Sequence, residues 1–349
     1  MSSEQKQYAA AGVDIAARSA FAKGLPGILA QARRPEVLSD AGPFSGLFRL
    51  GEKYRDPVLA ASADGIGTKV KVQLAANRLD LCGADILGHS VNDVLACGAE
   101  PIFFLDYIAG NGLTNDQKTT LVEGVARACA DAGCALLGGE TADMPDVYAP
   151  GDFDLAGFIV GVVERDRIID GSKIAAGDVL IGIPSAGLHT NGFSLARKVL
   201  GICDGEPEDE TRRRLEERPV VLSGQTVGEA LLATHVPYHR EILPIVDRVH
   251  GMAHITGGGY VENVPRILPE GVTARFDTRS WPVLPVFQLI QQRGEVSPEE
   301  MYEVFNMGIG MVLMVAPGDA DEVQASIAGS LRVGEIVPWT GRPVELRGL

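Results

Sequence analysis

The sequence predicts an α/β protein built from two domains. Its 349 residues exceed the roughly 150 that one domain usually holds. Short apolar runs typical of buried strands alternate along the chain with segments whose apolar residues recur at helical spacing. This pattern restarts near Asp170-Gly171, where we place the domain boundary. We therefore expect domains at residues 1–171 and 172–349.

Composition narrows the class of protein. Hydrophobic residues make up 46% of the chain and charged residues 22%, as in ordinary globular proteins. The net charge of −15 argues against a nucleic-acid surface, because binding phosphate backbones needs a basic patch. The five cysteines form no C-x-x-C pair and are interpreted as reduced thiols. Without a membrane-length apolar run or a signal sequence, we expect a soluble, cytoplasmic protein with no membrane partner.

The first half of the chain is expected to be ordered from about Tyr8. A helix-like segment at 19–32, interrupted by Pro26, is interpreted as a cap over the first domain. Thr114 and Gln117 have the spacing of a capping box, and the helix that they begin should stop at Gly133. Apolar patterning predicts a further helix at 80–97 and strands at 57–61, 102–108, 135–137 and 155–163.

The second half repeats the alternation of strands and helices. A strand is expected at 179–184, followed by a turn and a helix that runs through Leu200. A glycine cluster opens a helix near Tyr260, and 204–217 is a charged, solvated segment. Further strands are expected at 272–276 and 312–315, and a final one at 333–337.

The segment 62–69, S-A-D-G-I-G-T-K, follows the first strand and is the leading candidate for a phosphate site. Its two glycines allow backbone N–H groups to approach an anion closely. Thr68 adds a hydroxyl, Lys69 a positive charge, and Asp64 a carboxylate that can hold a divalent cation. Taken alone, the segment fits a solvated glycine turn equally well, and it lacks the Walker spacing.

Two further acidic positions point to a cation. Asn92 and Asp93 interrupt apolar helix positions, and an unpaired buried carboxylate is costly, so Asp93 should have a cation or strong donors. The alternative is a carboxylate exposed at a helix end. Residues 138–145, G-G-E-T-A-D-M-P, form a predicted small-residue turn at the carboxyl end of a strand, where ligands gather in open α/β sheets.

The predicted second domain carries two more segments of this kind. Residues 185–194 place His189 and Asn191 among small residues at a strand-to-helix turn, which suits contacts to phosphate or substrate. A lone histidine is often only structural, but the position of His189 at this turn favours a functional interpretation. Residues 254–259, H-I-T-G-G-G, are the third glycine cluster.

Taken together, these segments form a series in fixed order: A-D-G-I-G-T-K, V-N-D-V-L-A-C-G-A-E-P, G-G-E-T-A-D-M-P, G-L-H-T-N-G-F-S-L, H-I-T-G-G-G and N-M-G-I-G-M. The series closely resembles the aminoimidazole ribonucleotide synthetases, also called phosphoribosylformylglycinamidine cyclo-ligases. A-G-V-D-I near the start, R-R-P-E-V and F-F-L-D-Y add to the resemblance, which covers nearly the whole chain. One departure is Asp143, where the family usually has glutamate, so the charge is kept but the side chain is shorter.

The resemblance implies two domains, each a mixed β-sheet covered by helices. It also implies a homodimer in which the N-terminal sheets close a barrel across the interface. ATP and Mg²⁺ would bind near the cleft between the domains. Because the candidate acids, Thr68 and Lys69 precede the boundary and the candidate histidines follow it, we expect the N-terminal domain to hold the triphosphate and the second domain to close over the substrate. The implied reaction is the ATP-dependent ring closure of formylglycinamidine ribonucleotide to aminoimidazole ribonucleotide, a ligase step of purine biosynthesis.

Site residues follow from the motifs and the resemblance together. Expected metal ligands are Asp64, Asp93 and Glu140. Expected nucleotide-binding residues are Asp64, Gly65, Gly67, Thr68, Lys69, Asn92, Gly138, Gly139, Glu140 and Thr141. Expected substrate-binding residues are His189, Asn191, His254, Thr256 and Gly257. His189, Lys69 and Asp93 are the expected catalytic residues.

Other members of the superfamily are the nearest alternatives. Formylglycinamidine ribonucleotide synthetase carries extra domains, and selenophosphate synthetase has a reactive N-terminal cysteine or selenocysteine that this chain lacks. Thiamine-monophosphate kinase and the carbamoyl-dehydrating hydrogenase maturation factor fit the H-T-N-G-F-S-L segment less well. A non-catalytic nucleotide-binding dimer has no need of carboxylates clustered beside phosphate donors.

Overall fold

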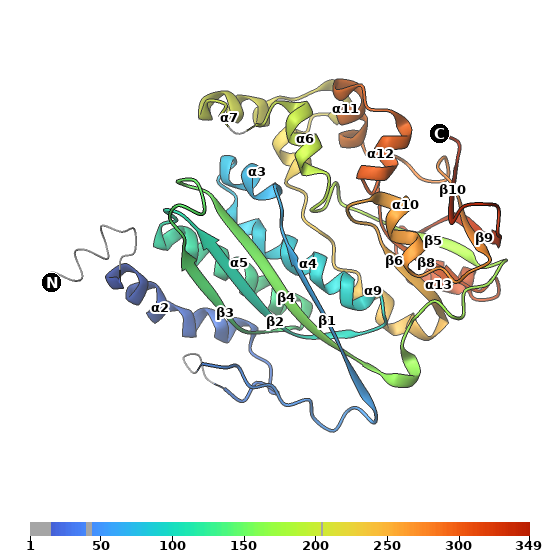
Figure 1. Ribbon diagram of the computed structural model, residues 1–349, viewed down its shortest axis with the longest axis horizontal. Coiled ribbons are helices and arrows are strands. Elements are labelled where there is room, and N and C mark those ends of the chain that lie inside the picture. Colours follow the sequence, from blue (N-terminus) through green and yellow to red (C-terminus); the bar gives the residue numbers. More distant parts are fainter. Residues whose placement is uncertain (1–14, 40–43, 204) are drawn as a thin grey trace.

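The computed structural model describes residues 15–39, 44–203 and 205–349 and contains two β-sheets with helices packed on them (Figure 1). The expected ordered segment from Tyr8 and the connection at Gly42-Pro43 lie outside the described residues. Among the helices described, none is long and apolar enough to span a membrane.

The first sheet has four strands in the order β1-β4-β2-β3. Both β1 and β2 run antiparallel to β4, and β3 runs parallel to β2, so the sheet is mixed. The carboxyl ends of β1, β2 and β3 therefore lie along one edge. The strand bounds are β1 Pro57–Gly65, β2 Glu100–Gly110, β3 Ala135–Asp143 and β4 Phe153–Glu164.

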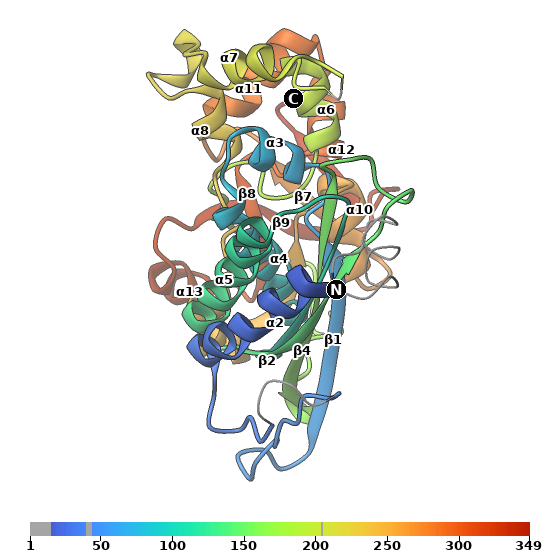
Figure 2. The ribbon, with the colours of Figure 1, turned by 90° about the vertical axis from the view of Figure 1, so that its left-hand side faces the viewer.

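Helices cover one face of this sheet (Figure 2). Helix α4 (Cys82–Leu95) packs over β1, β4 and β2, while α5 (Asn115–Ala132) and α2 (Ile15–Leu29) lie toward β3. The predicted limits of α5 are confirmed: Thr114 and Gln117 form the reciprocal capping box, and Gly133 ends the helix in the left-handed conformation. Helix α3 (Lys69–Ala75) follows β1 directly.

The second sheet has six strands in the order β10-β7-β9-β5-β8-β6. Every residue of β8 is buried, because apolar side chains from both sheet faces pack against helices. Only the β10–β7 pair is parallel, so this sheet is also mixed. The bounds are β5 Val179–Pro184, β6 Val249–His254, β7 Val272–Asp277, β8 Ile309–Val315, β9 Leu331–Pro338 and β10 Val344–Arg347.

Helices lie on both faces of the second sheet. One apolar core joins it to α6, α10, α11 and α12, and a smaller core joins it to α9 and α13. The bounds are α6 Phe193–Leu200, α7 Glu208–Glu216, α8 Val227–Leu231, α9 His239–Ile242, α10 Gly259–Asn263, α11 Pro285–Gly294, α12 Pro298–Val304 and α13 Ala320–Ser326.

The predicted mixed α/β fold is confirmed, and three local predictions are wrong. The first strand runs on to Gly65 and the third to Asp143, so Asp64 and Glu140 lie within strands rather than turns. Ladder hydrogen bonds to neighbouring strands stabilise these glycine-rich stretches against their poor strand propensity. The strand at 333–337 is not the last, because β10 pairs beyond it with β7.

Candidate active site

Helix α4 is the element around which the site is built, because it packs against both halves of the molecule. A Cβ on Gly88 would collide with the carbonyl oxygen of His235, so only glycine lets that segment approach the helix. One turn on, Asn92 donates to the carbonyl oxygen of Val236 at 2.8 Å and accepts from the backbone N–H of Tyr238 at 2.9 Å.

In this structure the amide of Asn92, an expected nucleotide-binding residue, contacts protein backbone. The residue is fully buried, and its amide donor and acceptor both bond to the backbone of the second half of the chain. These bonds hold residues 236–238 against α4.

Asp64 and Asp93 face the same small group of side chains. Asp64 on β1 lies 2.6 Å from Nε2 of His89, and Asp93 on α4 lies 2.9 Å from Nδ1 of His254 and 2.9 Å from Oγ of Ser62. Nε2 of His89 is also 3.9 Å from Asp93. The structure thus brings together two expected metal ligands and one expected substrate-binding histidine.

A chain of hydrogen bonds connects the two carboxylates through buried side chains. Nδ1 of His89 lies 2.8 Å from Oγ1 of Thr190, which lies 3.2 Å from Nδ1 of His235. Nε2 of His235 then lies 2.9 Å from Nε2 of His254, whose other ring nitrogen meets Asp93. Four of the six histidines of the chain gather here, since His189 stacks on His235 with ring centroids 4.1 Å apart.

The carboxylates and burial act in opposite directions on the histidine pKa values. Burial alone would lower the pKa of His89, but the hydrogen bond to Asp64 and the nearby charges of Asp64 and Asp93 outweigh it and raise the pKa. Burial dominates at His254 and lowers its pKa despite the bond to Asp93. At Asp93 burial is outweighed by the bond to His254 and nearby charge, and the pKa is lowered.

Lys69 does not have the phosphate-binding environment that the sequence suggested. Its side chain is fully buried, and Nζ lies 2.8 Å from Asp85, 2.8 Å from the carbonyl oxygen of His189 and 2.7 Å from that of Ala233. An ammonium group has three hydrogens, and these acceptors use them all. In this conformation Lys69 therefore has no hydrogen free for a phosphate, and it connects the two halves of the chain.

Burial moves both members of the Lys69–Asp85 pair toward their neutral forms. It lowers the pKa of Lys69 and raises that of Asp85, while their mutual attraction opposes both shifts. Gln73 and the backbone N–H of His235 also donate to Asp85, so both of its oxygens are hydrogen-bonded.

His189 is at the expected turn but is not accessible there. Its ring is 1% exposed, Nε2 accepts from the backbone N–H of Ala186, and Nδ1 is buried without a hydrogen-bond partner among the described residues. Burial lowers its pKa well below the usual value, so the ring is neutral. Direct contact with substrate, as predicted, would require the loop 185–192 to move.

The remaining expected residues of the two cleft walls lie at or near the surface. Gly67 and Thr68 are exposed, and Oγ1 of Thr68 lies 3.2 Å from Oγ of Ser194 across the cleft between the halves. Asn191 and Gly257 lie against each other. Among the residues expected to bind nucleotide or substrate at the cleft, Gly65, Asn191 and Thr256 are half-buried.

Glu140 is not beside the other two expected metal ligands in this chain. Register places it in one row with Tyr107, Ala156 and Gly65, three strand spacings or about 14 Å from β1. Because Gly65 follows Asp64 and side chains alternate along a strand, Glu140 projects to the opposite sheet face from Asp64. The predicted three-carboxylate magnesium site is therefore not assembled within one chain.

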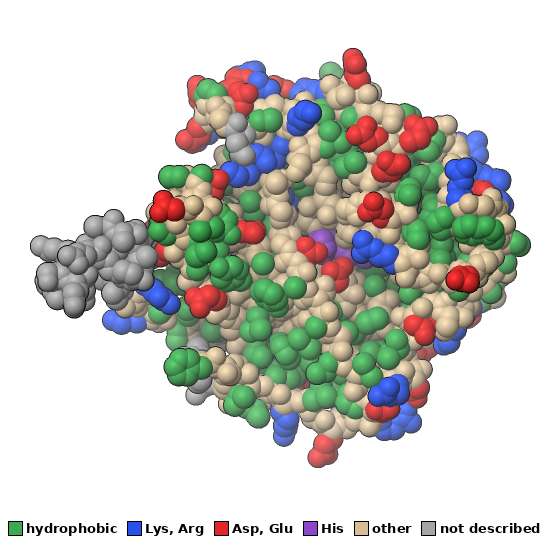
Figure 3. Space-filling view, in the orientation of Figure 1, with side chains coloured by type: hydrophobic (Ala, Val, Ile, Leu, Met, Phe, Trp, Pro, Cys, Tyr) green, Lys and Arg blue, Asp and Glu red, His purple; other side chains and the backbone are tan. Residues whose placement is uncertain are grey.

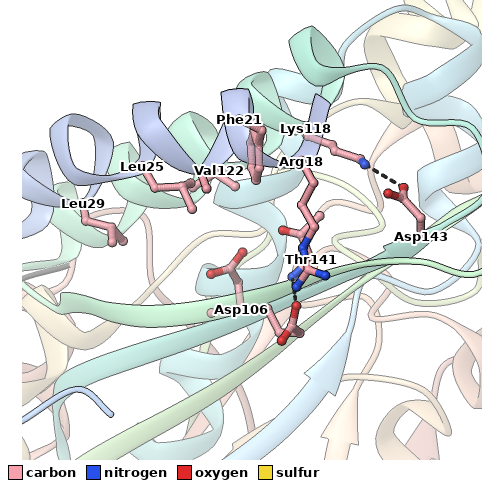
Figure 4. Close-up of a pocket in the computed structure, with 12 residues that line it drawn as sticks. Arg18, Phe21, Leu25, Leu29, Asp106, Lys118, Val122, Thr141 and Asp143 are labelled. Atoms are coloured by element: carbon pink, nitrogen blue, oxygen red, sulfur yellow. Dashed lines mark hydrogen bonds and ion pairs between the residues drawn. The ribbon is translucent and has the colours of Figure 1, made fainter. Parts of the chain in front are cut away.

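Glu140 and its neighbours instead line a cavity between α2 and the β2–β3 edge (Figure 4). Phe21, Leu25 and Leu29 point down from α2, and Asp106 and Thr141 approach from the sheet. Two pockets, which share Asp106 and Glu140 in their linings, measure ≈ 170 Å³ and ≈ 600 Å³. The expected nucleotide-binding residues in their lining are Gly138, Gly139, Glu140 and Thr141.

Asp106 is the unusual group of this cavity. Its side chain is nearly buried, no other described side chain bonds to its carboxylate, and burial raises its pKa to about 7. Nearby, Lys118 and Asp143 form an ion pair of 2.6 Å. Asp143, the position where the family usually has glutamate, is therefore paired with Lys118 in this structure.

A second cavity, a groove of ≈ 370 Å³, lies between the halves next to Asp93 and His254. Its lining includes Ser62, Thr256, Asn263 and the exposed Arg266. In the space-filling view a histidine surface near the centre of the face is surrounded by acidic and basic groups (Figure 3). Carboxylate, imidazole and guanidinium groups at one groove can bind a polar, anionic small molecule.

Sequence reasoning missed several residues that the structure places at the site. His89 and Asp93 are four positions apart on one helix and so share a face, which was a usable signal. His235, Asp85 and Arg266 carry no motif of their own. Only tertiary packing brings them to the site.

The chain belongs to the family of AIR synthase related proteins, whose N-terminal domain matches residues 46–163 and whose C-terminal domain matches residues 175–339. A curated relative is the phosphoribosylformylglycinamidine cyclo-ligase of Trichlorobacter lovleyi. It is 46% identical over 336 residues, which cover 94% of this chain and 93% of the relative.

Solved structures share the fold at low sequence identity. Thiamine-monophosphate kinase from Stenotrophomonas maltophilia K279a superposes with a TM-score of 0.64 and 17% identity, covering 93% of this chain and 96% of that one. The hydrogenase maturation protein HypE in complex with ATP gives 0.63 and 15% identity, with coverages of 92% and 89%. At these identities the likeness establishes the fold alone.

Proposed function

We propose that this protein is an enzyme that catalyses the ATP-dependent ring closure of formylglycinamidine ribonucleotide to aminoimidazole ribonucleotide. The products besides the ring are ADP and phosphate. The observation that carries this proposal is the similarity to cyclo-ligases along nearly the entire length of both chains. The substrates are small molecules, and the cavities beside the expected site residues are of matching size.

The chemistry requires the formamide oxygen to attack the terminal phosphoryl group of ATP. This turns a poor leaving group into phosphate, and an amidine nitrogen then closes the ring at the same carbon. Amide oxygen is a weak nucleophile, so positioning and neutralisation of phosphoryl charge supply most of the rate enhancement. The residues of the cleft should therefore hold both reactants in line and exclude water.

Asp64 and Asp93 are the proposed magnesium ligands. Their side chains are 37% and 27% exposed, whereas the histidines between them are buried, so carboxylate oxygens remain accessible to a hydrated cation. Magnesium usually takes one or two carboxylates together with phosphate oxygens and water, which fits this donor set. When bound, the ion neutralises developing charge on the transferred phosphoryl group.

We assign the base of ATP to the cavity beneath α2 and its phosphates to the strand ends at Gly65, Gly67 and Thr68. An apolar wall from α2 suits a flat ring, and the unpaired carboxylate of Asp106 can accept a hydrogen bond from an amino group. The strand ends that carry both sets of residues lie along one sheet edge.

The groove beside Asp93 and His254 is the proposed site of formylglycinamidine ribonucleotide. Arg266 can pair with its phosphate, while His254, Thr256 and Asn263 line the route toward Asp93. Lys69 is proposed to act indirectly, by fixing the backbone of His189, rather than by touching phosphate.

We also propose a homodimer formed by the uncovered face of the first sheet, with the two sheets closing a barrel. Leu59 and Phe158 are 59% and 43% exposed on that face, next to Leu105 and Val160 in the ladder. In the space-filling view apolar side chains gather over this part of the molecule (Figure 3). A partner sheet packed on this face would bury Leu59 and Phe158.

The proposed domain limits are 1–171 and 172–349. The first sheet ends at Glu164, the second begins at Val179, and no strand is shared between them.

The test is ATP turnover by the purified protein with formylglycinamidine ribonucleotide as the second substrate. We expect ADP release and formation of the aminoimidazole product, both dependent on magnesium. Asp93→Asn should abolish turnover while the circular dichroism spectrum stays unchanged. Turnover that depends on thiamine monophosphate instead would refute the proposed function. Wild-type activity of Asp93→Asn at limiting magnesium would refute the proposed role of Asp93.

A further inference from the structure

We propose that His89, Asp93 and His254 form a binding site for a divalent transition metal, represented here by Zn²⁺. Each of the three offers one ligand atom, and these atoms lie within 4.8 Å of one another. Imidazole nitrogen with carboxylate oxygen is a donor set that suits zinc, cobalt and nickel, whereas magnesium prefers oxygen alone. The site therefore differs in chemistry from the proposed magnesium site, although both use Asp93 and both can use Asp64.

The separations of the ligand atoms fit a tetrahedral ion after small adjustments. Bonds of about 2.0–2.1 Å in a tetrahedron put neighbouring ligand atoms about 3.3 Å apart. Nε2 of His89 lies 3.9 Å from Asp93, and Nδ1 of His254 lies 2.9 Å from the same carboxylate. Asp64, 2.6 Å from Nε2 of His89, is available as the fourth ligand.

The second layer of contacts orients both histidines for metal binding. The nitrogen of His89 that faces away from the carboxylates meets Thr190, and that of His254 meets His235. A metal-bound histidine keeps its proton on the far ring nitrogen and donates it to such a partner. The near nitrogens, Nε2 of His89 and Nδ1 of His254, then present lone pairs to the ion.

The hydrogen count of this network leaves room for one positive charge, which a bound cation or an extra proton on His89 can supply. Five contacts join Asp64, His89, Thr190, His235, His254 and Asp93 in a chain. Each contact needs one hydrogen, but three neutral imidazoles and one hydroxyl supply four. With an ion on the two outer contacts, three inner contacts remain, and the three imidazole hydrogens satisfy them.

The ion has a route to this site. His89 and His254 are 4% and 7% exposed, but Asp93 and His254 both border the groove of ≈ 370 Å³ between the halves. Enclosure strengthens binding because little water competes for the ion. If the proposed function holds, zinc should also inhibit turnover, since it occupies a carboxylate assigned to magnesium.

Binding is measured on the metal-free full-length protein, without ATP or ribonucleotide, by titrating Co²⁺ and then displacing it with Zn²⁺. We expect one ion per chain and visible absorption bands typical of tetrahedral Co²⁺. We also expect no intense near-ultraviolet thiolate band, because the proposed ligands exclude the cysteines. Stoichiometric Co²⁺ binding that shows the thiolate band, or no binding at all, would overturn the proposal.

Variants locate the site. His89→Gln and His254→Gln should weaken Zn²⁺ binding by more than the roughly 10- to 100-fold typical of losing an outer-shell partner, and Thr190→Val by about that amount. His250→Gln is the matched control, since His250 bonds to Asp178 outside the cluster. Equal loss in the control and in His254→Gln would contradict the assignment.

Thermal unfolding and ATP turnover distinguish the loss of the metal site from misfolding and from failure of the proposed function. Zn²⁺ should raise the thermal midpoint of the wild type and of His250→Gln but not of His254→Gln. If the histidine variants do not fold, the Co²⁺ spectrum of the wild type decides alone. Zn²⁺ binding without ribonucleotide-dependent ATP turnover would refute the proposed function and leave the metal site intact, and the reverse result would refute only the metal site.

Discussion

At the scale of single residues, the buried charges determine which side chains are structural. Lys69 has no exposed surface and three acceptors, whereas Lys71, two positions on in the same helix, pairs with Asp152 near the surface. Removing one member of a fully buried pair leaves an uncompensated charge, while a pair that is partly exposed to water contributes less. The two lysines therefore give a matched comparison.

Lys69→Met should lower the free energy of unfolding by about 3–5 kcal/mol, because Asp85 would remain buried without its cation. Lys71→Met should cost at most about 1 kcal/mol. Urea denaturation of both variants measures the difference. Similar losses in the two would show that the Lys69 pair has no special structural role.

Asp106 should make stability depend on pH between about 4 and 7. Its pKa is raised from the ordinary value to about 7 in the folded state, so the folded protein binds more protons than the unfolded chain in that window. Stability is therefore greatest below the window and falls as pH rises through it.

Asp106→Asn removes this ionisation and should be more stable than the wild type at pH 8, by on the order of 2–4 kcal/mol. The variant should also lose the decline between about pH 4 and 7. Thermal unfolding at several pH values measures both effects. Parallel curves for variant and wild type would assign the pH dependence to other groups.

At the scale of elements, α4 depends on a close approach to the segment around His235. Gly88 has no room for a Cβ there, whereas a Cβ on Gly24 of α2 would meet no atom within 4 Å among the described residues. Replacing glycine by alanine should stabilise the helix by the same amount at both sites through helix propensity. Any difference between the two substitutions therefore reports the contact.

Gly88→Ala should destabilise the protein by roughly 1–3 kcal/mol through overpacking against backbone. Gly24→Ala should be neutral or stabilising by up to about 1 kcal/mol. Denaturant unfolding of both variants measures these changes in stability, provided that the slopes of the unfolding curves stay unchanged. A stabilised Gly88→Ala would mean that the segment at His235 moves away at little cost.

At the scale of the whole molecule, the uncovered face of the first sheet, which exposes Leu59 and Phe158, is the surface that the proposed dimer would bury. Phe158 lies on this face, while Val220, 97% exposed, lies in the second half of the chain. A charge placed within a buried interface is strongly unfavourable, but a charge on a solvated loop is not.

Phe158→Glu should convert the dimer to a monomer at micromolar concentration, and Val220→Glu should leave it a dimer. Analytical ultracentrifugation distinguishes the two states. A wild-type protein that sediments as a monomer, or a Phe158→Glu protein that stays dimeric, would contradict the proposed interface.

The sequence by itself determined the α/β class and many element positions, because apolar periodicity and capping are local signals. The capping box at Thr114 and the stop at Gly133 are examples. It also identified Asp64, Asp93 and His254, which the structure brings together. Strand limits beyond Ala61 and Leu137 were missed, since glycine-rich stretches become strands only through pairing with neighbours.

Tertiary structure alone decided the roles of the buried polar groups. Lys69 and Asn92 carry ordinary ligand-binding chemistry, but packing encloses them and supplies backbone partners from residues more than 100 positions away. Likewise, Glu140 was separated from Asp64 by strand order and side-chain alternation, neither of which is written in a local motif. The burial and register of a side chain are properties of the assembled sheet and helices, and these properties determine whether a given acid or base can reach a ligand.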